Sequence, residues 1–91
     1  YAIFSAGGDV SKCWAKRFTD AGVVVIDNTS VFRMNKKIPL VVPEINISAA
    51  RHSDKLIANP NCSTIQLVLV LDRLRKISQI NRFNYIKLSL I

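Results

Sequence analysis

The residues best suited to chemistry lie together in one short segment, Asn59-Pro60-Asn61-Cys62-Ser63-Thr64. An apolar run and a turn precede Cys62 and a long amphipathic pattern follows it, so we expect the thiol at the start of a helix. Unpaired backbone N–H groups and the helix dipole favour negative charge there, and a thiol so placed is readily converted to a nucleophilic thiolate. The same N–H groups could hold the oxyanion that forms when the thiolate attacks a carbonyl. The alternative for Cys62 is a cysteine that only packs in a core.

The other cysteine and the single histidine receive no catalytic assignment. Cys13 falls on the apolar face of a predicted amphipathic helix, so we expect it in the core. His52 lies in the polar stretch Arg51-His52-Ser53-Asp54 and is expected at the surface. Two cysteines are too few for a fold stapled by disulfides, and no metal site is predicted.

The elements that must position Cys62 begin with a strand, a helix and a second strand. The apolar run from Tyr1 to Ser5 ends at a Gly-Gly pair and predicts a buried strand. The next helix should be capped by Asp9 or Ser11 and end at Gly22, with an apolar face formed by Val10, Cys13, Trp14, Phe18 and Ala21. The β-branched run from Val23 to Ile26 is typical of a parallel strand buried on both faces. The three together predict a β-α-β unit with a right-handed crossover.

The rest of the chain continues the alternation of strands and helices. We expect, in order, a polar loop at 27–30, a short strand at 40–42 between two prolines, a short helix within 44–51, a strand at 56–58, a long helix from Ser63, and a last strand at 83–91. The long helix carries a wide apolar face that contains Ile65, Leu67, Val68, Leu71, Leu74 and Ile77. The predicted fold class is therefore α/β with parallel strands.

Composition and charge limit the kinds of partner. The 91 residues are 49% apolar with a formal net charge of +7, which fits one small globular unit and excludes intrinsic disorder. The basic residues are scattered and the aromatic residues do not interleave with them, so we expect solvated helix faces and no nucleic-acid partner. An anionic substrate or cofactor is the alternative explanation of the charge. No apolar run reaches the roughly 18 residues that span a bilayer and no signal peptide is visible, so we expect no membrane partner and a cytoplasmic location.

Five segments of the chain closely resemble the aspartate-semialdehyde dehydrogenases, and they cover about positions 3–82 in register. These segments are 4–8, 21–30, 32–34, 39–46 and 57–66. The resemblance implies the reduction of aspartyl phosphate by NADPH to aspartate semialdehyde, with release of phosphate and NADP, in the biosynthesis of lysine, threonine and methionine. It implies these small molecules as partners, and a homodimer or homotetramer for the full-length enzyme.

The resemblance also implies roles for individual residues. Cys62 matches the family's nucleophile, which carries the thioester, and Arg33 matches its phosphate-binding arginine, whose planar guanidinium suits a bidentate contact. Asn61 matches an asparagine beside the phosphate and the thiol. From the residues alone, Arg33 could instead form a loop salt bridge, and Asn61 could serve only the turn. The loop Ser5-Ala6-Gly7-Gly8 matches the turn near NADP, where small residues allow close backbone approach, and a simple chain reversal is the alternative.

The fold of the family implies two domains. Residues 1–60 would be the C-terminal part of a Rossmann-like NAD(P)-binding domain, and residues 61–91 the start of an α+β catalytic and dimerisation domain. The family's Gly-rich pyrophosphate loop would precede Tyr1, and its catalytic histidine, acyl-positioning glutamine and carboxylate-binding arginine would follow Ile91. We therefore expect an internal fragment that is inactive alone. After Arg82 the sequence departs from the family's pattern.

Two other functions stay open on the sequence. The first is a related reductase of N-acetylglutamyl phosphate. The sequence around the thiol in that family is similar to Pro-Gly-Cys, whereas this chain has Pro60-Asn61-Cys62, which argues against this alternative. The second is a noncatalytic remnant or small basic binding module, because the cofactor loop and the downstream catalytic partners are absent from the 91 residues. The coding sequence on both sides would discriminate this second alternative from the enzyme.

Overall fold

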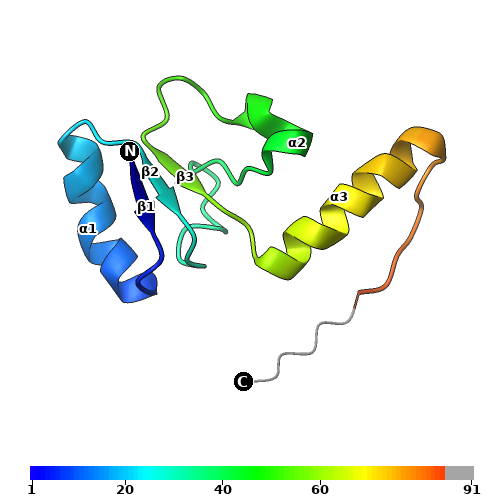
Figure 1. The fold of residues 1–91 in the computed structure, drawn as a ribbon, viewed down its shortest axis with the longest axis horizontal. Coiled ribbons are helices and arrows are strands. Elements are labelled where there is room, and N and C mark those ends of the chain that lie inside the picture. Colours follow the sequence, from blue (N-terminus) through cyan, green and yellow to red (C-terminus); the bar gives the residue numbers. More distant parts are fainter. Residues whose placement is uncertain (86–91) are drawn as a thin grey trace.

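The elements of the chain follow the alternation that its sequence predicts. The computed structural model describes residues 1–85, and its elements in chain order are β1 (Ala2–Phe4), α1 (Gly8–Asp20), β2 (Val25–Asp27), α2 (Pro43–Asn46), the 3-10 helix η1 (Ile47–Ala49), β3 (Leu56–Ala58) and α3 (Cys62–Ile77). The strands form one parallel sheet in the order β1-β2-β3 (Figure 1). The predicted α/β class with parallel strands is confirmed.

β2 is the central strand of the sheet and holds its most buried residues. Val25 and Asp27 in β2 and Ala58 in β3 are fully buried, although β2 begins two residues later than the predicted run 23–26. In the strand register, Phe4, Asp27 and Ala58 lie in one row, and each is the last residue of its strand. The residues that follow these three therefore leave the sheet along one edge, the carboxyl edge, where α/β folds bind ligands.

α1 packs on the sheet through a face different from the predicted one. Its buried residues are Ser11 and Ala15, one turn apart, whereas Cys13 is exposed. The prediction that Cys13 lies in the core is wrong, because the small side chains of Ser11 and Ala15 form the face that contacts β2, and hydrophobicity alone does not identify them. The N-cap of α1 is Gly7, so neither Asp9 nor Ser11 caps the helix.

β1 forms one edge of the described sheet and is less buried than predicted. Ile3 is 78% exposed, because within residues 1–85 no strand pairs with the outer side of β1. Next to it, the rings of Phe4 and Phe18 pack edge to face with centroids 5.1 Å apart, and Trp14 packs on Phe18 at 6.5 Å. These side chains line an apolar groove of about 420 Å³ between β1 and α1.

The predicted strand at 40–42 is not formed. Leu40 makes a single parallel bridge to Ala58, and the N–H of Val41 donates to the Ala58 carbonyl. Both valines of the run are buried, so the run contributes to the core without adding a strand to the sheet. The two flanking prolines prevent a longer strand pairing. Pro39 has no N–H to donate to a ladder, and Pro43 occupies the first turn of α2, where proline is favoured.

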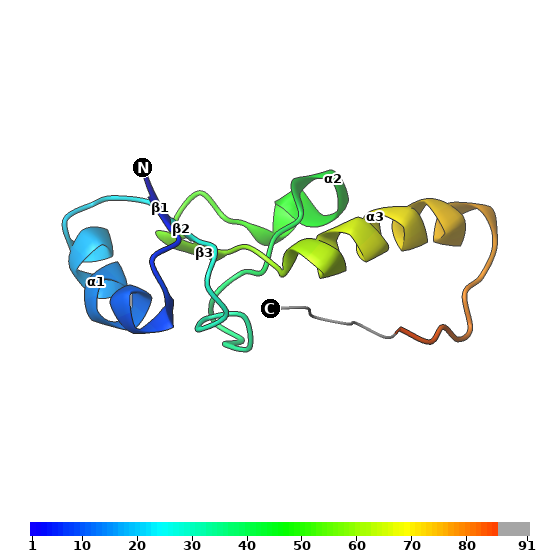
Figure 2. The same cartoon turned by 60° about the horizontal axis from the view of Figure 1, so that its bottom comes forward.

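α3 begins at Cys62, one residue earlier than predicted, and runs away from the sheet (Figure 2). α1 and α3 lie at opposite ends of the molecule in both views. The Cα radius of gyration is 15.0 Å, whereas a compact chain of this length would have about 12 Å. Consistent with this, Val70, Leu74 and Ile77 are 58%, 50% and 84% exposed, so the described residues cover only part of the helix's apolar face. The domain boundary between residues 60 and 61 stays a prediction.

The remaining predictions concern the short helix and the end of the chain. The short helix expected within 44–51 corresponds to α2 and η1. Residues 83–85 form no strand, contrary to the prediction for 83–91, and residues 86–91 lie outside the described residues. Among residues 1–85, no helix has the length and apolar character needed to cross a membrane, and no three His, Cys, Asp or Glu side chains are grouped to bind a metal.

Candidate active site at the carboxyl edge of the sheet

The thiol of Cys62 lies at the N-terminus of α3, directly after the turn that follows β3. Asn61 is the N-cap of this helix, and its Oδ1 accepts hydrogen bonds from the Ser63 N–H at 3.0 Å and from the Ser63 hydroxyl at 2.6 Å. The Cys62 side chain is exposed, with its Sγ 3.9 Å from the same Oδ1. Core packing therefore does not account for Cys62, and its thiol is open to a substrate.

The first turn of α3 leaves backbone N–H groups free beside the thiol. Within residues 1–85, the N–H groups of Cys62 and Thr64 have no acceptor, whereas the N–H groups of Ser63 and Ile65 bind the side chain and the carbonyl of Asn61. Free N–H groups at the start of a helix attract anions, because the helix dipole adds partial positive charge there. These two groups have the chemistry needed to hold an oxyanion.

Arg33 lies in the loop after β2 and bridges the ends of two strands. Its Nε donates to the Asn59 carbonyl at 2.9 Å, and its Nη2 donates to the Asn28 carbonyl at 3.0 Å. Asn28 directly follows β2 and Asn59 directly follows β3, so the guanidinium is held at the carboxyl edge of the sheet. Within residues 1–85, Arg33 pairs with no carboxylate, so the alternative of a loop salt bridge is not observed. Its remaining N–H groups have no acceptor in the described chain.

The hydrogen bond from Arg33 to Asn59 joins the arginine to the segment that carries the thiol. Asn61 and Cys62 follow Asn59 closely along the chain, so the Cα atoms of Asn59 and Cys62 are at most about 11 Å apart. The side chains of Asn59 and Asn28 are also joined, because Asn59 Nδ2 donates to Asn28 Oδ1 at 2.9 Å. Three of the predicted site residues, Arg33, Asn61 and Cys62, are thus gathered at one edge of the sheet.

The predicted cofactor loop, Ser5-Ala6-Gly7-Gly8, joins β1 to α1 at the same edge of the sheet. Asn28 Nδ2 donates to Ser5 Oγ at 3.4 Å, which links this loop to the Arg33 side of the site. Gly7 has a φ of +99°, a conformation that side chains rarely adopt, so this turn requires glycine. The first three residues of the loop are exposed, and no side chain caps the N-terminus of α1. The loop therefore fits a nucleotide that closely approaches the backbone.

A buried polar network that the sequence analysis missed holds the start of the Arg33 loop. The carboxylate of Asp27 is fully buried and accepts hydrogen bonds from Ser11 Oγ at 2.7 Å, Thr29 Oγ1 at 2.7 Å and the Thr29 N–H at 3.2 Å. Ser11 is also fully buried, so this network joins α1, β2 and the following loop. The sequence does contain a signal for this network, because Asp27 directly follows a buried β-branched run and Thr29, a hydroxyl residue, lies two positions later.

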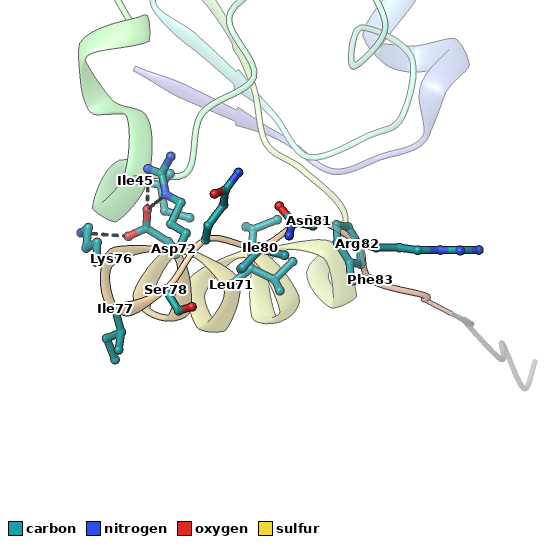
Figure 3. Close-up of a pocket in the computed structure, with 13 residues that line it drawn as sticks. Ile45, Leu71, Asp72, Lys76, Ile77, Ser78, Ile80, Asn81, Arg82 and Phe83 are labelled. Carbon is teal, nitrogen blue, oxygen red and sulfur yellow. Dashed lines mark hydrogen bonds and ion pairs between the residues drawn. The ribbon is translucent and has the colours of Figure 1, made fainter.

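A larger hollow lies away from Cys62, beside the C-terminal half of α3 (Figure 3). It has a volume of about 870 Å³, and its lining includes Ile45, Leu71, Ile80 and Phe83. The carboxylate of Asp72, which is 6% exposed, pairs there with Arg75 at 2.7 Å and Lys76 at 3.0 Å. Hydrogen bonds from Lys76 and Arg75 lower the pKa of Asp72 below its ordinary value. Two cations thus neutralise this carboxylate, and neither cysteine nor histidine lines the hollow, so the reactive groups lie elsewhere.

Comparison with known proteins assigns the chain to a family. Residues 1–53 match the family described as semialdehyde dehydrogenase, NAD binding domain. The chain therefore belongs to the semialdehyde dehydrogenase family of oxidoreductases, and its parallel sheet with flanking helices is a Rossmann-like α/β fold.

Within that family the chain is similar to aspartate-semialdehyde dehydrogenases, which confirms the resemblance. It is 51% identical to the enzyme of Bacillus subtilis over 81 residues, 57% identical to that of Aquifex aeolicus over 72 residues and 52% identical to aspartate-semialdehyde dehydrogenase 2 of Vibrio cholerae over 85 residues. The alignments cover 89%, 77% and 91% of this chain but 23%, 21% and 25% of the relatives. The chain thus spans about a quarter of the length of these relatives.

Solved structures of the same enzymes share the local fold. Aspartate semialdehyde dehydrogenase II from Vibrio cholerae, complexed with ASA, superposes with a TM-score of 0.78 at 51% identity, over 84% of this chain and 26% of that chain. The Candida albicans enzyme with NADP gives a TM-score of 0.66 at 27% identity, over 86% of this chain and 26% of that chain. The fold around the site is therefore the fold of this enzyme group.

Proposed function

We propose that residues 1–91 supply the nucleophile and a phosphate site for the reduction of aspartyl phosphate to aspartate semialdehyde. The observation that carries this proposal is the exposed Cys62 thiol at the N-terminus of α3. The segment that carries this thiol is hydrogen-bonded to the Arg33 guanidinium through the Asn59 carbonyl. The similarity to aspartate-semialdehyde dehydrogenases, one of them solved with ASA, supports the choice of substrate. We further propose a role in amino-acid biosynthesis and a cytoplasmic location, where the thiol would stay reduced.

The first chemical step is acyl transfer to sulfur. The Cys62 thiolate attacks the acyl carbon of aspartyl phosphate, the carbon–oxygen bond to phosphate breaks, and phosphate leaves as a thioester forms. The free N–H groups of Cys62 and Thr64 hold the oxyanion of the tetrahedral intermediate. Arg33 holds the phosphate, because a guanidinium offers parallel N–H donors to its oxygens. Asn61 acts through its side chain, which fixes the first turn of α3 around the thiol.

The second step returns the thiolate. A bound NADPH would supply the hydride that reduces the thioester carbonyl carbon, and breakage of the carbon–sulfur bond would then release aspartate semialdehyde and the Cys62 thiolate. Ser5, Ala6, Gly7 and Gly8 would hold this cofactor, because the loop is small, largely exposed and joined to an uncapped helix N-terminus. The choice of NADP over NAD belongs to the proposal, and it is supported by a solved relative that carries NADP.

The chain spans only about a quarter of the length of its relatives. We propose that the remaining parts of the active site correspond to the parts of those relatives that this chain does not match. We infer that residues 1–60 belong to the nucleotide-binding domain and 61–91 to a catalytic domain, which also forms a homodimer or homotetramer. By this proposal the 91 residues alone do not turn over substrate. The apolar residues of α3 that are at least half exposed, Val70, Leu74 and Ile77, support the presence of further covering structure.

A chimaera tests the proposed function. The matched 81 residues of the Bacillus subtilis relative, which is 51% identical, are replaced by the residues of this chain. We expect phosphate-dependent oxidation of aspartate semialdehyde by NADP in the chimaera, a loss of about 1,000-fold or more in Cys62→Ser with NADP binding retained, and normal turnover in the matched control Cys13→Ser. Near-normal turnover of Cys62→Ser would contradict the assignment, and an inactive but folded chimaera would favour a noncatalytic role.

A further inference from the structure

Two asparagines at the strand ends hold Arg33 in place, and no sequence motif assigned them a role. The guanidinium donates to the backbone carbonyls of Asn28 and Asn59, at 3.0 and 2.9 Å. The same residues are joined through their side chains, because Asn59 Nδ2 donates to Asn28 Oδ1 at 2.9 Å. Arg33 therefore rests on a pair of residues that are themselves bonded to each other.

The backbone of both asparagines is fixed by the sheet. The Asn28 N–H donates to the Phe4 carbonyl at 2.8 Å, and the Asn59 N–H donates to the Asp27 carbonyl at 2.8 Å. Each residue thus extends the hydrogen-bond ladder by one position beyond its strand, while its own carbonyl stays available to Arg33. The hydrogen bond between the two side-chain amides joins the ends of β2 and β3.

The link between the two side chains needs a donor at position 59 and an acceptor at position 28. Asn28 uses its Oδ1 to accept from Asn59, whereas its Nδ2 donates to Ser5 Oγ at 3.4 Å, outside the link. Asn59 supplies the donor. Alanine at either position removes the link, whereas aspartate at position 28 keeps the oxygen that accepts from Asn59.

We propose that Asn28 and Asn59 form an amide clasp that sets the position of the Arg33 guanidinium for phosphate, so both are positioning residues. The proposal rests on the proposed function in one respect, namely that Arg33 binds phosphate next to Cys62. Two of the guanidinium's N–H groups are held by the clasp carbonyls, and the remaining ones, free within residues 1–85, are left for the phosphate oxygens. Positioning of this kind matters because a displacement of about 1 Å can lower a rate about 100-fold.

The first arm of the test measures the clasp in the 91-residue chain without any assay of activity. Hydrogen exchange of the Arg33 Nε–H, followed by NMR, should be slow in the parent chain compared with that of the exposed Arg51. In Asn28→Ala and in Asn59→Ala we expect exchange at least about tenfold faster, with no further increase in the double variant, because the two residues act as one unit. Asn81→Ala, an exposed asparagine outside the clasp, is the matched control.

The variant Asn28→Asp keeps the result interpretable if an alanine variant fails to fold. It retains the acceptor for Asn59 Nδ2, so we expect it to keep the slow exchange of the Arg33 Nε–H. Unchanged exchange in folded alanine variants, additive effects in the double variant, or fast exchange in Asn28→Asp would each overturn the clasp.

The second arm uses the chimaera and separates positioning from folding. With the clasp broken by Asn59→Ala, we expect the KM for phosphate to rise about tenfold while the KM for aspartate semialdehyde stays within about twofold. An equal rise in both constants would overturn the positioning role. An inactive parent chimaera would contradict the proposed function instead, and it would leave the exchange result on the clasp intact, so the two failures are distinguishable.

Discussion

Removal of the Ser11 hydroxyl tests the buried network that holds the start of the Arg33 loop. Ser11 on α1 and Asp27 at the end of β2 are both fully buried, and Ser11 Oγ donates to Asp27 Oδ1 at 2.7 Å. In Ser11→Ala the carboxylate keeps its two bonds from Thr29 but loses the one from α1. Alanine offers no replacement donor, so one acceptor site of a buried carboxylate is left unsatisfied.

The size of the effect follows from the burial and the charge of the acceptor. A hydrogen bond to a charged group contributes about 1.5–3 kcal/mol, so we expect Ser11→Ala to lower the free energy of unfolding by about 2 kcal/mol. Chains of this length typically have about 5–14 kcal/mol in total. Within residues 1–85 the buried apolar core consists of Ala15, Val25, Val41, Val42 and Ala58, so we place the total stability near the lower limit. The single hydroxyl therefore accounts for a large share of the stability.

Urea titration of the 91-residue chain, followed by circular dichroism, measures this loss. With a urea slope of about 1 kcal/mol per molar for a small chain, the midpoint of Ser11→Ala should fall by about 2 M. Thr29→Val, which removes the other 2.7 Å hydroxyl bond to Asp27, should give a similar fall. Ser48→Ala, at an exposed position of η1, is the matched control and should leave the midpoint unchanged. Equal midpoints for Ser11→Ala and Ser48→Ala would refute the reasoning.

Four further predictions concern Arg33, Asp72, NADP and the two cysteines. In the chimaera, Arg33→Lys should raise the KM for phosphate clearly more than that for the semialdehyde, because lysine cannot form a two-pronged contact, and equal effects would indicate a folding role. Because hydrogen bonds from Lys76 and Arg75 lower the pKa of Asp72, its contribution to stability is present above the ordinary value of 3.8 and is lost as the pH falls through and below it. Urea midpoints measured against pH should therefore show a steeper acid loss in the parent chain than in Asp72→Asn, and parallel curves would contradict the pairing. The isolated chain should bind NADP weakly by calorimetry, while iodoacetamide should label Cys62 about twofold to fivefold faster than Cys13, because only Cys62 lies at a helix N-terminus. Micromolar NADP affinity, or equal labelling rates, would contradict these two expectations.

Local patterns were sufficient to predict the elements that the chain forms by itself. The β-branched run before Asp27, the glycines at the ends of α1 and the turn before Cys62 each have a short-range signal, and each marks an observed element boundary to within about two residues. The face of α1 could not be predicted in this way, because the buried Ser11 is selected by a carboxylate 16 positions later in the chain. A scale of hydrophobicity ranks Cys13 above Ser11 and so assigns the wrong face.

The difference between short-range and long-range contacts also separates the predicted parts of the site from the missed ones. The place of Cys62 at the start of a helix follows from local signals in the sequence. The cap at Asn61 also depends on contacts within two residues, although the sequence analysis did not predict it. The clasp joins Asn28 to Asn59 across 31 positions, and Arg33 binds a carbonyl 26 positions away. These contacts exist only because β2 and β3 are parallel neighbours, which brings both strand ends to one edge. Reasoning about the tertiary pairing of strands would be needed to find them.

The shortness of the strands explains why polar side chains gather at this edge. Each of β1, β2 and β3 has three residues, so the ladder supplies few hydrogen bonds and the residues just beyond the strands must complete it. Asn28 and Asn59 do so with their backbone and side chains, and the same atoms hold Arg33. Stability and positioning therefore depend on shared residues at this edge. Loss of activity in a clasp variant would not separate the two roles, whereas a change in phosphate affinity at constant semialdehyde affinity would, because unfolding lowers the amount of active enzyme without changing either Michaelis constant.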